Sequence, residues 1–277
     1  MTNKLRVDLN LTLTDRIEYG MNYNFFIYNG NRDWNLLDFV PDTVSDTVAP
    51  ADRDLYKFEY ENDTLLDNLY MKMSPYYGDI TIGKQQISMG TGYAWNPTDV
   101  FNTKEVSDPT YEQTGRYAVR LDLPVADRTT AVMIYGSDDD IKNFTSLLKI
   151  KSGYSRYDFS LVAVRTEKTK TDYINFASKE HDRILLGGDV VGELFGLGVW
   201  CEYAYNFMED TSDYAETVIG TDYTLTNGVY LMSEYFRNTA AEVNQENYDL
   251  NDWLKYMSAE RKSISRDQLY MLVTVPA

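Results

Sequence analysis

The residue types that most often carry catalysis or bind metals are nearly absent from this chain of 277 residues. There is one histidine, His181, between Glu180 and Asp182, where we expect an exposed loop. The single cysteine, Cys201, falls on the apolar face of an alternating run, where cysteine acts as a small hydrophobe. Neither a Cys/His metal cluster nor an intrachain disulfide can be built from these two residues. We therefore expect no catalytic residue, no metal site, no cofactor and no enzymatic activity.

The most unusual stretch is GKQQISMGTGYAWNPTDVFN, from Gly83 to Asn102. It begins like an amphipathic strand and then breaks into glycines, aromatic residues and an Asn-Pro turn. No helical pattern follows the glycines, so the stretch does not match a phosphate-binding loop or a dinucleotide fingerprint. What it does must depend on the elements around it.

Charge and hydropathy exclude several classes of protein. The net charge of −17 would repel nucleic-acid phosphates, so we expect no nucleic-acid partner. No apolar run approaches the ~18 residues of a membrane-spanning helix. The start, MTNKLRVDLNLTLT, lacks the continuous apolar core of a signal peptide.

Strict alternation of apolar and polar residues recurs along nearly the whole chain and predicts about fourteen strands. The clearest runs are LRVDLNLTL, IEYGMNYNFFI, GRYAVRLDL, RYDFSLVA, RILLGGDVVG, LGVWCEYAYNF and QLYMLVTV. Weaker strands are predicted near 55–61, 68–75, 79–88, 128–136, 144–151, 214–225 and 228–237.

Strand length and loop length together favour a transmembrane barrel. The strands approach the ~9–11 residues that cross a bilayer at a tilt. Some joints are two to five residues long, whereas 28–54 and 167–181 are much longer, and short turns at one end with long loops at the other are typical of such barrels. Tyr203, Tyr205 and Phe207 suit an aromatic girdle at the lipid interface. A soluble sandwich also alternates, so it stays open as an alternative.

One inconsistency remains in the strand count. Two long loops on the same side require an even number of strands between them, yet three are predicted between 28–54 and 89–114. Either one strand is misidentified or one long segment lies on the other side.

The stretch from Gly83 to Phe101 resembles a family of porin-like outer-membrane β-barrels of Gram-negative bacteria. That family carries the form G-[RK]-Q-x-I-x-W-G-x-G-x-x-W-N-P-T-D-x-F, and Met89 stands here where the family has the first tryptophan. The resemblance implies an all-β antiparallel transmembrane barrel in the outer membrane. It implies no particular solute.

The physical properties of the same stretch favour a loop that folds into the lumen over 89–114. Glycines allow sharp turns and close approach to a wall, and Asn-Pro ends the extended run. Trp95 and Phe101 are too apolar for a free loop. A constriction that sets pore size, a plug that stiffens the barrel and a surface loop all remain open. The candidate residues are Gly90, Gly92, Tyr93, Trp95, Asn96, Pro97, Asp99 and Phe101.

Polar residues opposite the apolar faces should line the lumen, where acids and bases nearly balance. The candidates are Arg6, Glu18, Arg116, Arg120, Asp122, Arg156, Asp158 and Glu202. The acidic excess lies in loops instead, with six aspartates against two arginines in 28–54 and four acids without a base in 208–217. We expect a weak cation preference that arises at the mouth.

We therefore predict one β-barrel domain over 1–277, a channel for passive diffusion of small polar solutes, with outer-membrane lipid as its other partner. The alternative is a non-conducting binding or adhesion barrel that acts through its long acidic loops. We also expect the chain to be a fragment of a longer barrel, because it lacks a signal peptide and stops at VTVPA. The sequence does not indicate an oligomeric state.

Overall fold

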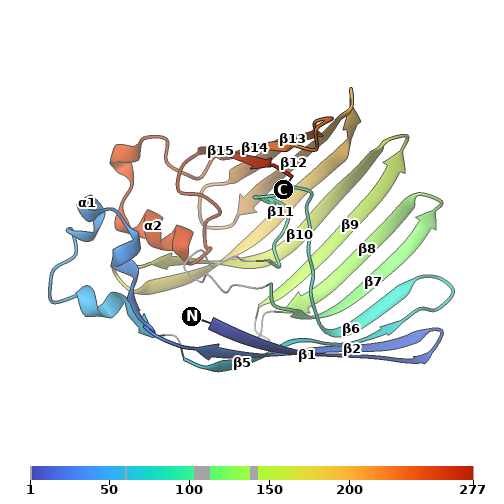
Figure 1. The fold of residues 1–277 in the computed structure, drawn as a ribbon, viewed down its shortest axis with the longest axis horizontal. Coiled ribbons are helices and arrows are strands. Elements are labelled where there is room, and N and C mark those ends of the chain that lie inside the picture. Colours follow the sequence, from blue (N-terminus) through green and yellow to red (C-terminus); the bar gives the residue numbers. More distant parts are fainter. Residues whose placement is uncertain (1, 60, 103–112, 138–142, 277) are drawn as a thin grey trace.

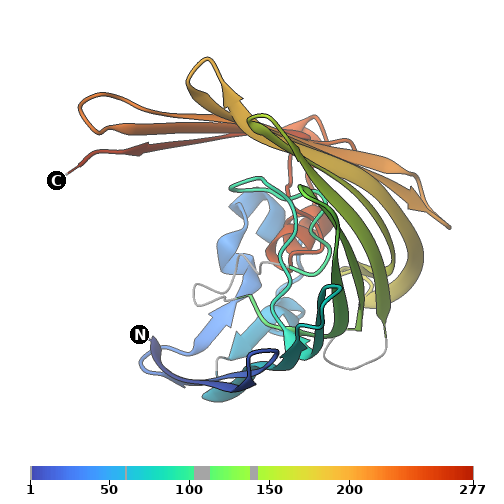
Figure 2. The ribbon, with the colours of Figure 1, turned by 90° about the vertical axis from the view of Figure 1, so that its right-hand side faces the viewer.

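The computed structural model describes residues 2–276 except 60, 103–112 and 138–142. Thirteen strands form one antiparallel sheet in which they lie side by side in chain order, with the short strands β3 (Asp33–Asn35) and β4 (Lys57–Glu59) left out. The sheet curves into a wall with one concave and one convex face (Figures 1 and 2). The all-β antiparallel fold is confirmed, with one sheet strand fewer than the predicted fourteen.

The wall begins at β1 and ends at β15, and these two edge strands do not pair with each other among the described residues. The sheet is therefore open in this structure. Its strands are β1 (Thr2–Thr14), β2 (Ile17–Tyr28), β5 (Asp63–Met73), β6 (Asp79–Gln85), β7 (Arg116–Ala126), β8 (Thr129–Ser137), β9 (Phe144–Tyr154), β10 (Tyr157–Asp172), β11 (Ala177–Leu194), β12 (Leu197–Met208), β13 (Tyr214–Thr224), β14 (Tyr230–Asn238) and β15 (Asp267–Thr274).

The strand predicted near 55–61 is reduced to the three residues of β4 and lies outside the main sheet. Residues Arg53–Tyr56 form a 3-10 helix, η2, and β4 (Lys57–Glu59) pairs only with β3 (Asp33–Asn35) in a small separate hairpin. The same excursion contains η1 (Leu36–Phe39) and α1 (Asp42–Ser45). Two strands, β5 and β6, therefore separate the two long loops, and both loops leave from the same end of the wall.

The long joint predicted at 167–181 is wrong, because β10 continues to Asp172 and β11 begins at Ala177. Their pairing is continuous from Tyr157 with Gly192 to Asp172 with Ala177. The two strands thus form one long hairpin that extends beyond its neighbours on the long-loop side.

The connection from β14 to β15 carries structure that the alternation pattern did not predict. It holds η3 (Gln245–Asn247) and α2 (Leu250–Met257). Asp249 caps α2 by accepting a hydrogen bond from the Asp252 amide, and the Asp252 side chain accepts one from the Asp249 amide. No helix in the described residues is long and apolar enough to cross a membrane.

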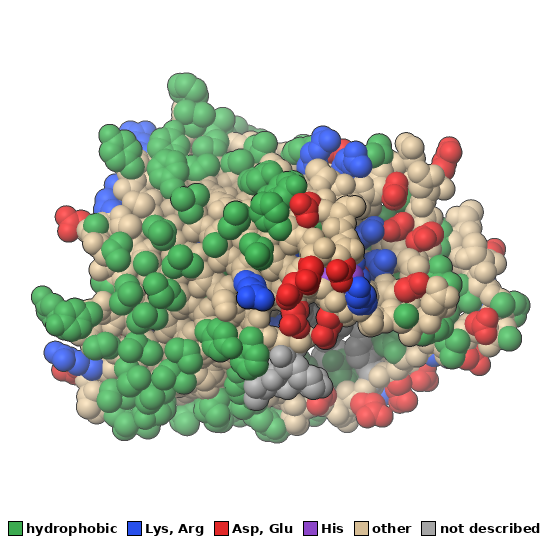
Figure 3. Space-filling view, turned by 180° about the vertical axis from the view of Figure 1, so that it is seen from behind, with side chains coloured by type: hydrophobic (Ala, Val, Ile, Leu, Met, Phe, Trp, Pro, Cys, Tyr) green, Lys and Arg blue, Asp and Glu red, His purple; other side chains and the backbone are tan. Residues whose placement is uncertain are grey.

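The convex face of the wall is apolar and exposed (Figure 3). Along β1 its exposed residues are Leu5, Val7, Leu9, Leu11 and Leu13, and similar rows follow on the other strands. Exposed aromatic residues lie near both ends of the strands, including Tyr76, Tyr77, Tyr154 and Phe195 at the short turns and Tyr135, Phe144 and Phe207 at the opposite end. An apolar band between two aromatic belts is the surface that lipid requires.

Candidate functional site

The segment 86–102, between β6 and the undescribed residues 103–112, lies against the concave face (Figure 2). It contains residues 89–102 of the loop predicted over 89–114; residues 113–114 of that loop are also described, and 103–112 lie outside the described residues. Because it has almost no regular secondary structure, its backbone amides must find partners elsewhere. Many of those partners are side chains of the wall, and others lie within the segment.

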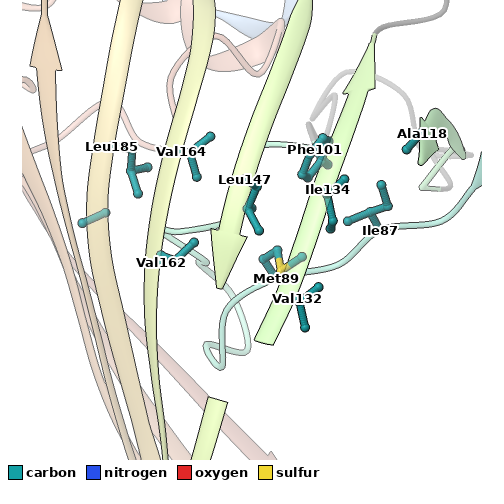
Figure 4. Packing of buried hydrophobic residues seen from close by; sticks show 11 residues of the cluster. Ile87, Met89, Phe101, Ala118, Val132, Ile134, Leu147, Val162, Val164 and Leu185 are labelled. Carbon is teal, nitrogen blue, oxygen red and sulfur yellow. The ribbon is translucent and has the colours of Figure 1, made fainter. Parts of the chain in front are cut away.

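Three apolar side chains anchor the segment. Ile87, Met89 and Phe101 are 1%, 6% and 5% exposed and pack into one buried cluster (Figure 4). The wall contributes Ala118, Val132, Ile134, Leu147, Val162, Val164, Leu185 and Ala204, from the concave face of six strands, β7 to β12. Burial of a large apolar side chain stabilises by about 1.5–3 kcal/mol, so this cluster contributes strongly to docking.

Glu202 on β12 binds the segment through its backbone. One carboxylate oxygen accepts hydrogen bonds from the amides of Thr91 at 2.8 Å and Gly92 at 3.4 Å. The other accepts from the amide of Thr98 at 2.6 Å and from its hydroxyl at 2.9 Å. Glu202 was predicted to line the lumen, and it does point from the concave face, but its side chain is fully buried. It is not a charge that water or solutes can reach.

Glu234 on β14 holds the next turn in the same way. It accepts hydrogen bonds from the amides of Tyr93 at 2.6 Å, Ala94 at 2.8 Å and Trp95 at 3.0 Å. The indole nitrogen of Trp200 donates a fourth at 2.7 Å. Together the two fully buried glutamates accept eight hydrogen bonds. Hydrogen bonds to a carboxylate are stronger than neutral ones, so these contacts hold the segment firmly.

The two glycines at the centre of the segment make this close approach possible. A Cβ at Gly90 would lie 2.5 Å from Asn96 Oδ1 and 2.6 Å from a Glu202 carboxylate oxygen, and Gly90 also has φ of +86°. A Cβ at Gly92 would lie 1.8 Å from the Trp95 carbonyl oxygen. Only glycine fits at either position.

Aromatic stacking and one lysine complete the attachment. Trp95 stacks on Phe236 of β14 with ring centroids 5.1 Å apart, and Tyr93 stacks on Tyr270 of β15 at 5.9 Å. Lys262, which follows α2, donates to the carbonyl oxygens of Asn96, Pro97 and Asp99. The segment is therefore held at β12, at β14 and β15, and by the α2 connection.

Asp99 shapes the end of the segment. Its side chain accepts hydrogen bonds from the amides of Met89, Phe101 and Asn102 at 3.2, 3.1 and 3.1 Å. Burial raises the pKa of this carboxyl, while the backbone hydrogen bonds and the Lys262 charge oppose that shift.

The other predicted wall residues are spread along the concave face, mostly paired. Arg6 pairs with Asp8 and approaches the buried Asp67, and Arg120 pairs with Asp122. Glu18 is exposed, and Arg116 donates a hydrogen bond to the Phe101 carbonyl oxygen. Arg156 pairs with Glu193, and Asp158 pairs with Arg128. Only Arg116 and Glu202 of this set touch the segment.

Several residues of the site escaped the sequence analysis. Glu234 lies in a weakly patterned strand, where alternation reveals its face but not its partner. Lys262 lies in a connection with no predicted structure. His181, expected in an exposed loop, is 6% exposed on the concave face of β11, because the hairpin extends past it. The pair Lys149–Asp189, at 3.2 Å, was also missed.

A curved antiparallel meander, apolar outside, with short turns at one end and long loops at the other, has the architecture of the wall of a porin-type β-barrel. The chain is similar in structure to OmpT, an outer membrane protein of Vibrio cholerae solved in its trimer form. The TM-score is 0.51 at 13% identity, over 86% of this chain and 70% of that one.

Two further similar structures have lower TM-scores. They are the Salmonella typhi OmpF complex with daunomycin (0.49, 9% identity, 90% of this chain and 75% of that one) and the anion-selective porin from Comamonas acidovorans (0.48, 10% identity, 86% and 70%). No protein-family model and no curated protein sequence matches the chain. At such identities the likeness concerns the fold.

Proposed function

We propose that the protein is an outer-membrane channel for passive diffusion of small polar solutes and has no enzymatic activity. The observation that carries this proposal is the segment 86–102, docked on the concave face of a porin-type wall. A segment held by buried carboxylates at fixed points on the concave face would narrow the lumen of a closed barrel. This supports the constriction over the surface loop.

The experiment is single-channel conductance in planar bilayers. Deletion of 90–99 would leave Glu202 and Glu234 buried without donors, so the deletion is combined with Glu202→Gln and Glu234→Gln. The matched control carries the two substitutions and the intact segment. We expect conductance from the unmodified protein and a larger conductance from the deletion variant than from its control.

Two results would count against the proposal. A folded, heat-resistant protein that carries no current favours the binding or adhesion barrel. Equal conductance of the folded deletion variant and its control means that the segment does not limit flow.

The proposal includes a weak cation preference. Its support is the acidic excess of the loops, six aspartates against two arginines in 28–54 and the three exposed acids Glu209, Asp210 and Asp213. The fourth acid expected there, Glu216, is buried in β13 beside Lys262. These acidic loops flank the long-loop end of the wall, where they would raise the local concentration of cations.

A further inference from the structure

A cavity of about 910 Å³ lies beside the docked segment on the long-loop side. Its boundaries are residues 94–102, the far part of β10, the start of β13 and residues 255–262 at the end of α2 and beyond. This volume lies within the range of ~300–1,000 Å³ typical of pockets for small molecules. The cavity is therefore large enough for an organic solute.

Four bases that line the cavity have no carboxylate partner among the described residues. Lys168 donates to the Tyr214 hydroxyl at 2.9 Å, and Lys170 donates to the Thr211 hydroxyl at 2.7 Å. The side chains of Lys255 and Arg183 make no hydrogen bond or ion pair within the described part of the chain, and Arg183 Nε is buried without an acceptor. In a protein of net charge −17, such a group of bases is a local exception.

The acids around the same cavity are already engaged. Glu216 lies 3.7 Å from Lys262 Nζ, and Asp99 accepts three backbone amides. Asp213 accepts from the Met208 amide at 2.9 Å, and Glu260 accepts from the Thr171 amide at 2.9 Å. Glu167 belongs to the outward-facing row of β10. None of these five carboxylates forms an ion pair with the four unpaired bases.

Charge repulsion acts within the group of bases. Burial lowers the pKa of Lys170, and the charges of Lys168 and Lys255 lower it further, whereas Tyr214 and Glu260 oppose that shift. An anion placed among these residues would relieve that repulsion, and bases on a strand and on a helix could hold two anionic groups of one molecule at once.

We propose that this cavity binds small organic anions that carry two negative charges as carboxylate or phosphate groups. The inference rests on the proposed function in one respect, since the anion would be a solute that enters the channel. Lys168, Lys170, Arg183 and Lys255 would bind the anionic groups, while Tyr214 and Thr211 orient the two strand lysines.

The test is calorimetric titration of the full chain, folded in detergent, with succinate and with glucose 6-phosphate as probes. Neutral succinamide is the ligand control. We expect Lys170→Gln/Lys255→Gln to weaken binding at least tenfold. The matched control is Lys151→Gln, which removes an exposed base from the concave face at the short-turn end. It should change the affinity less than twofold.

Two outcomes would overturn the inference. The first is that the unmodified folded protein binds neither anion. The second is an equal loss of affinity in the double variant and in Lys151→Gln, which would indicate nonspecific attraction. Binding of one probe alone identifies the anionic group that the site prefers. Because titration requires no current, a protein that conducts but binds neither anion retains the proposed function. One that binds but does not conduct retains the anion site.

Discussion

Glu202 and Glu234 recognise the backbone of the segment 86–102, whereas the usual partner of a buried carboxylate is a base. Six of the eight donors that reach them are main-chain amides. The path of the chain is therefore fixed at these points through its backbone, and the Tyr93 side chain, which is 57% exposed, is left to stack on Tyr270.

Replacement of Glu234 by alanine should release the middle of the segment. Three backbone amides and the Trp200 indole would lose their acceptor in a buried place. We expect a loss of about 3 kcal/mol in the free energy of unfolding, measured by urea titration in detergent. The control is Glu193→Ala, whose exposed pair with Arg156 should contribute less than about 1 kcal/mol. Similar losses in both variants would contradict a special role for Glu234.

Gly90→Ala tests whether glycine is needed at this position because a Cβ would clash with its neighbours or because the backbone has a positive φ. Gly90 and Gly196 both have positive φ, +86° and +81°, but a Cβ at Gly196 would meet no atom within 4 Å. Gly196→Ala should therefore cost only the conformational strain of about 1 kcal/mol. Gly90→Ala should cost more and should expose 86–102 to limited proteolysis in the folded protein. An equal protease resistance of the two variants would show that the contact with Glu202 is unimportant.

The sequence could reveal those site residues that are unusual in type and spacing, but not the wall residues that hold them. Gly90, Gly92 and Trp95 stand out by type and spacing, and they indicated a chain packed closely against a wall. The acceptors on that wall carry no such signal, because Glu202 and Glu234 are single polar residues in alternating strands. Their pairing with amides more than 100 positions away depends on the curvature of the whole sheet.

At the scale of elements, alternation predicted strands well where one face meets lipid and the other is polar. It failed at 55–61, where the polar and apolar residues form a turn of helix and a three-residue strand outside the wall. It also failed at 167–181, where both faces of β10 and β11 become polar because the hairpin has left the apolar band. In both places the chain has left the part of the wall with one apolar and one polar face, and alternation alone does not show where it leaves.

The two faces of β1 provide a direct test of membrane orientation. Leu9, 58% exposed, and its neighbour Asn10, also exposed, point to opposite sides of the strand. Leu9→Arg should reduce stability by about 2–4 kcal/mol if the site lies near the bilayer midplane, because arginine would face lipid. Asn10→Arg should change it by less than about 1 kcal/mol, since that side faces water. Urea titration in lipid vesicles measures both, and equal costs would indicate that β1 does not face lipid.

Over the whole molecule, charge is distributed unevenly. The wall pairs most of its acids with bases, for example Lys149 with Asp189 and Arg120 with Asp122. The net charge of −17 therefore arises mainly from the loops. The sequence predicted a nearly balanced wall and acidic loops. It could not show that Glu202 is buried away from water or that four bases lie together beside the segment.

Reversal potentials across a bilayer, measured in a salt gradient, test the proposed ion preference. Exposed loop charges are screened over about 10 Å at 0.1 M salt and about 3 Å at 1 M. We expect a weak cation preference at low ionic strength that fades at high ionic strength. Neutralisation of the exposed acids Glu209, Asp210 and Asp213 should weaken it further. Anion preference at low salt, or a cation preference that does not respond to salt, would contradict a mouth origin.

The attachment of 86–102 to strands far along the chain also determines an order of assembly. Thr98 and Glu202 are 104 positions apart, and Tyr93 and Glu234 are 141 apart. Contacts between such distant positions form slowly, because the intervening chain must first be ordered. Here the intervening chain is the wall itself, so its hairpins should pair before either carboxylate meets its amides. Docking then becomes the final step of folding, and a nascent protein passes through a stage with the sheet formed and its interior still open to water.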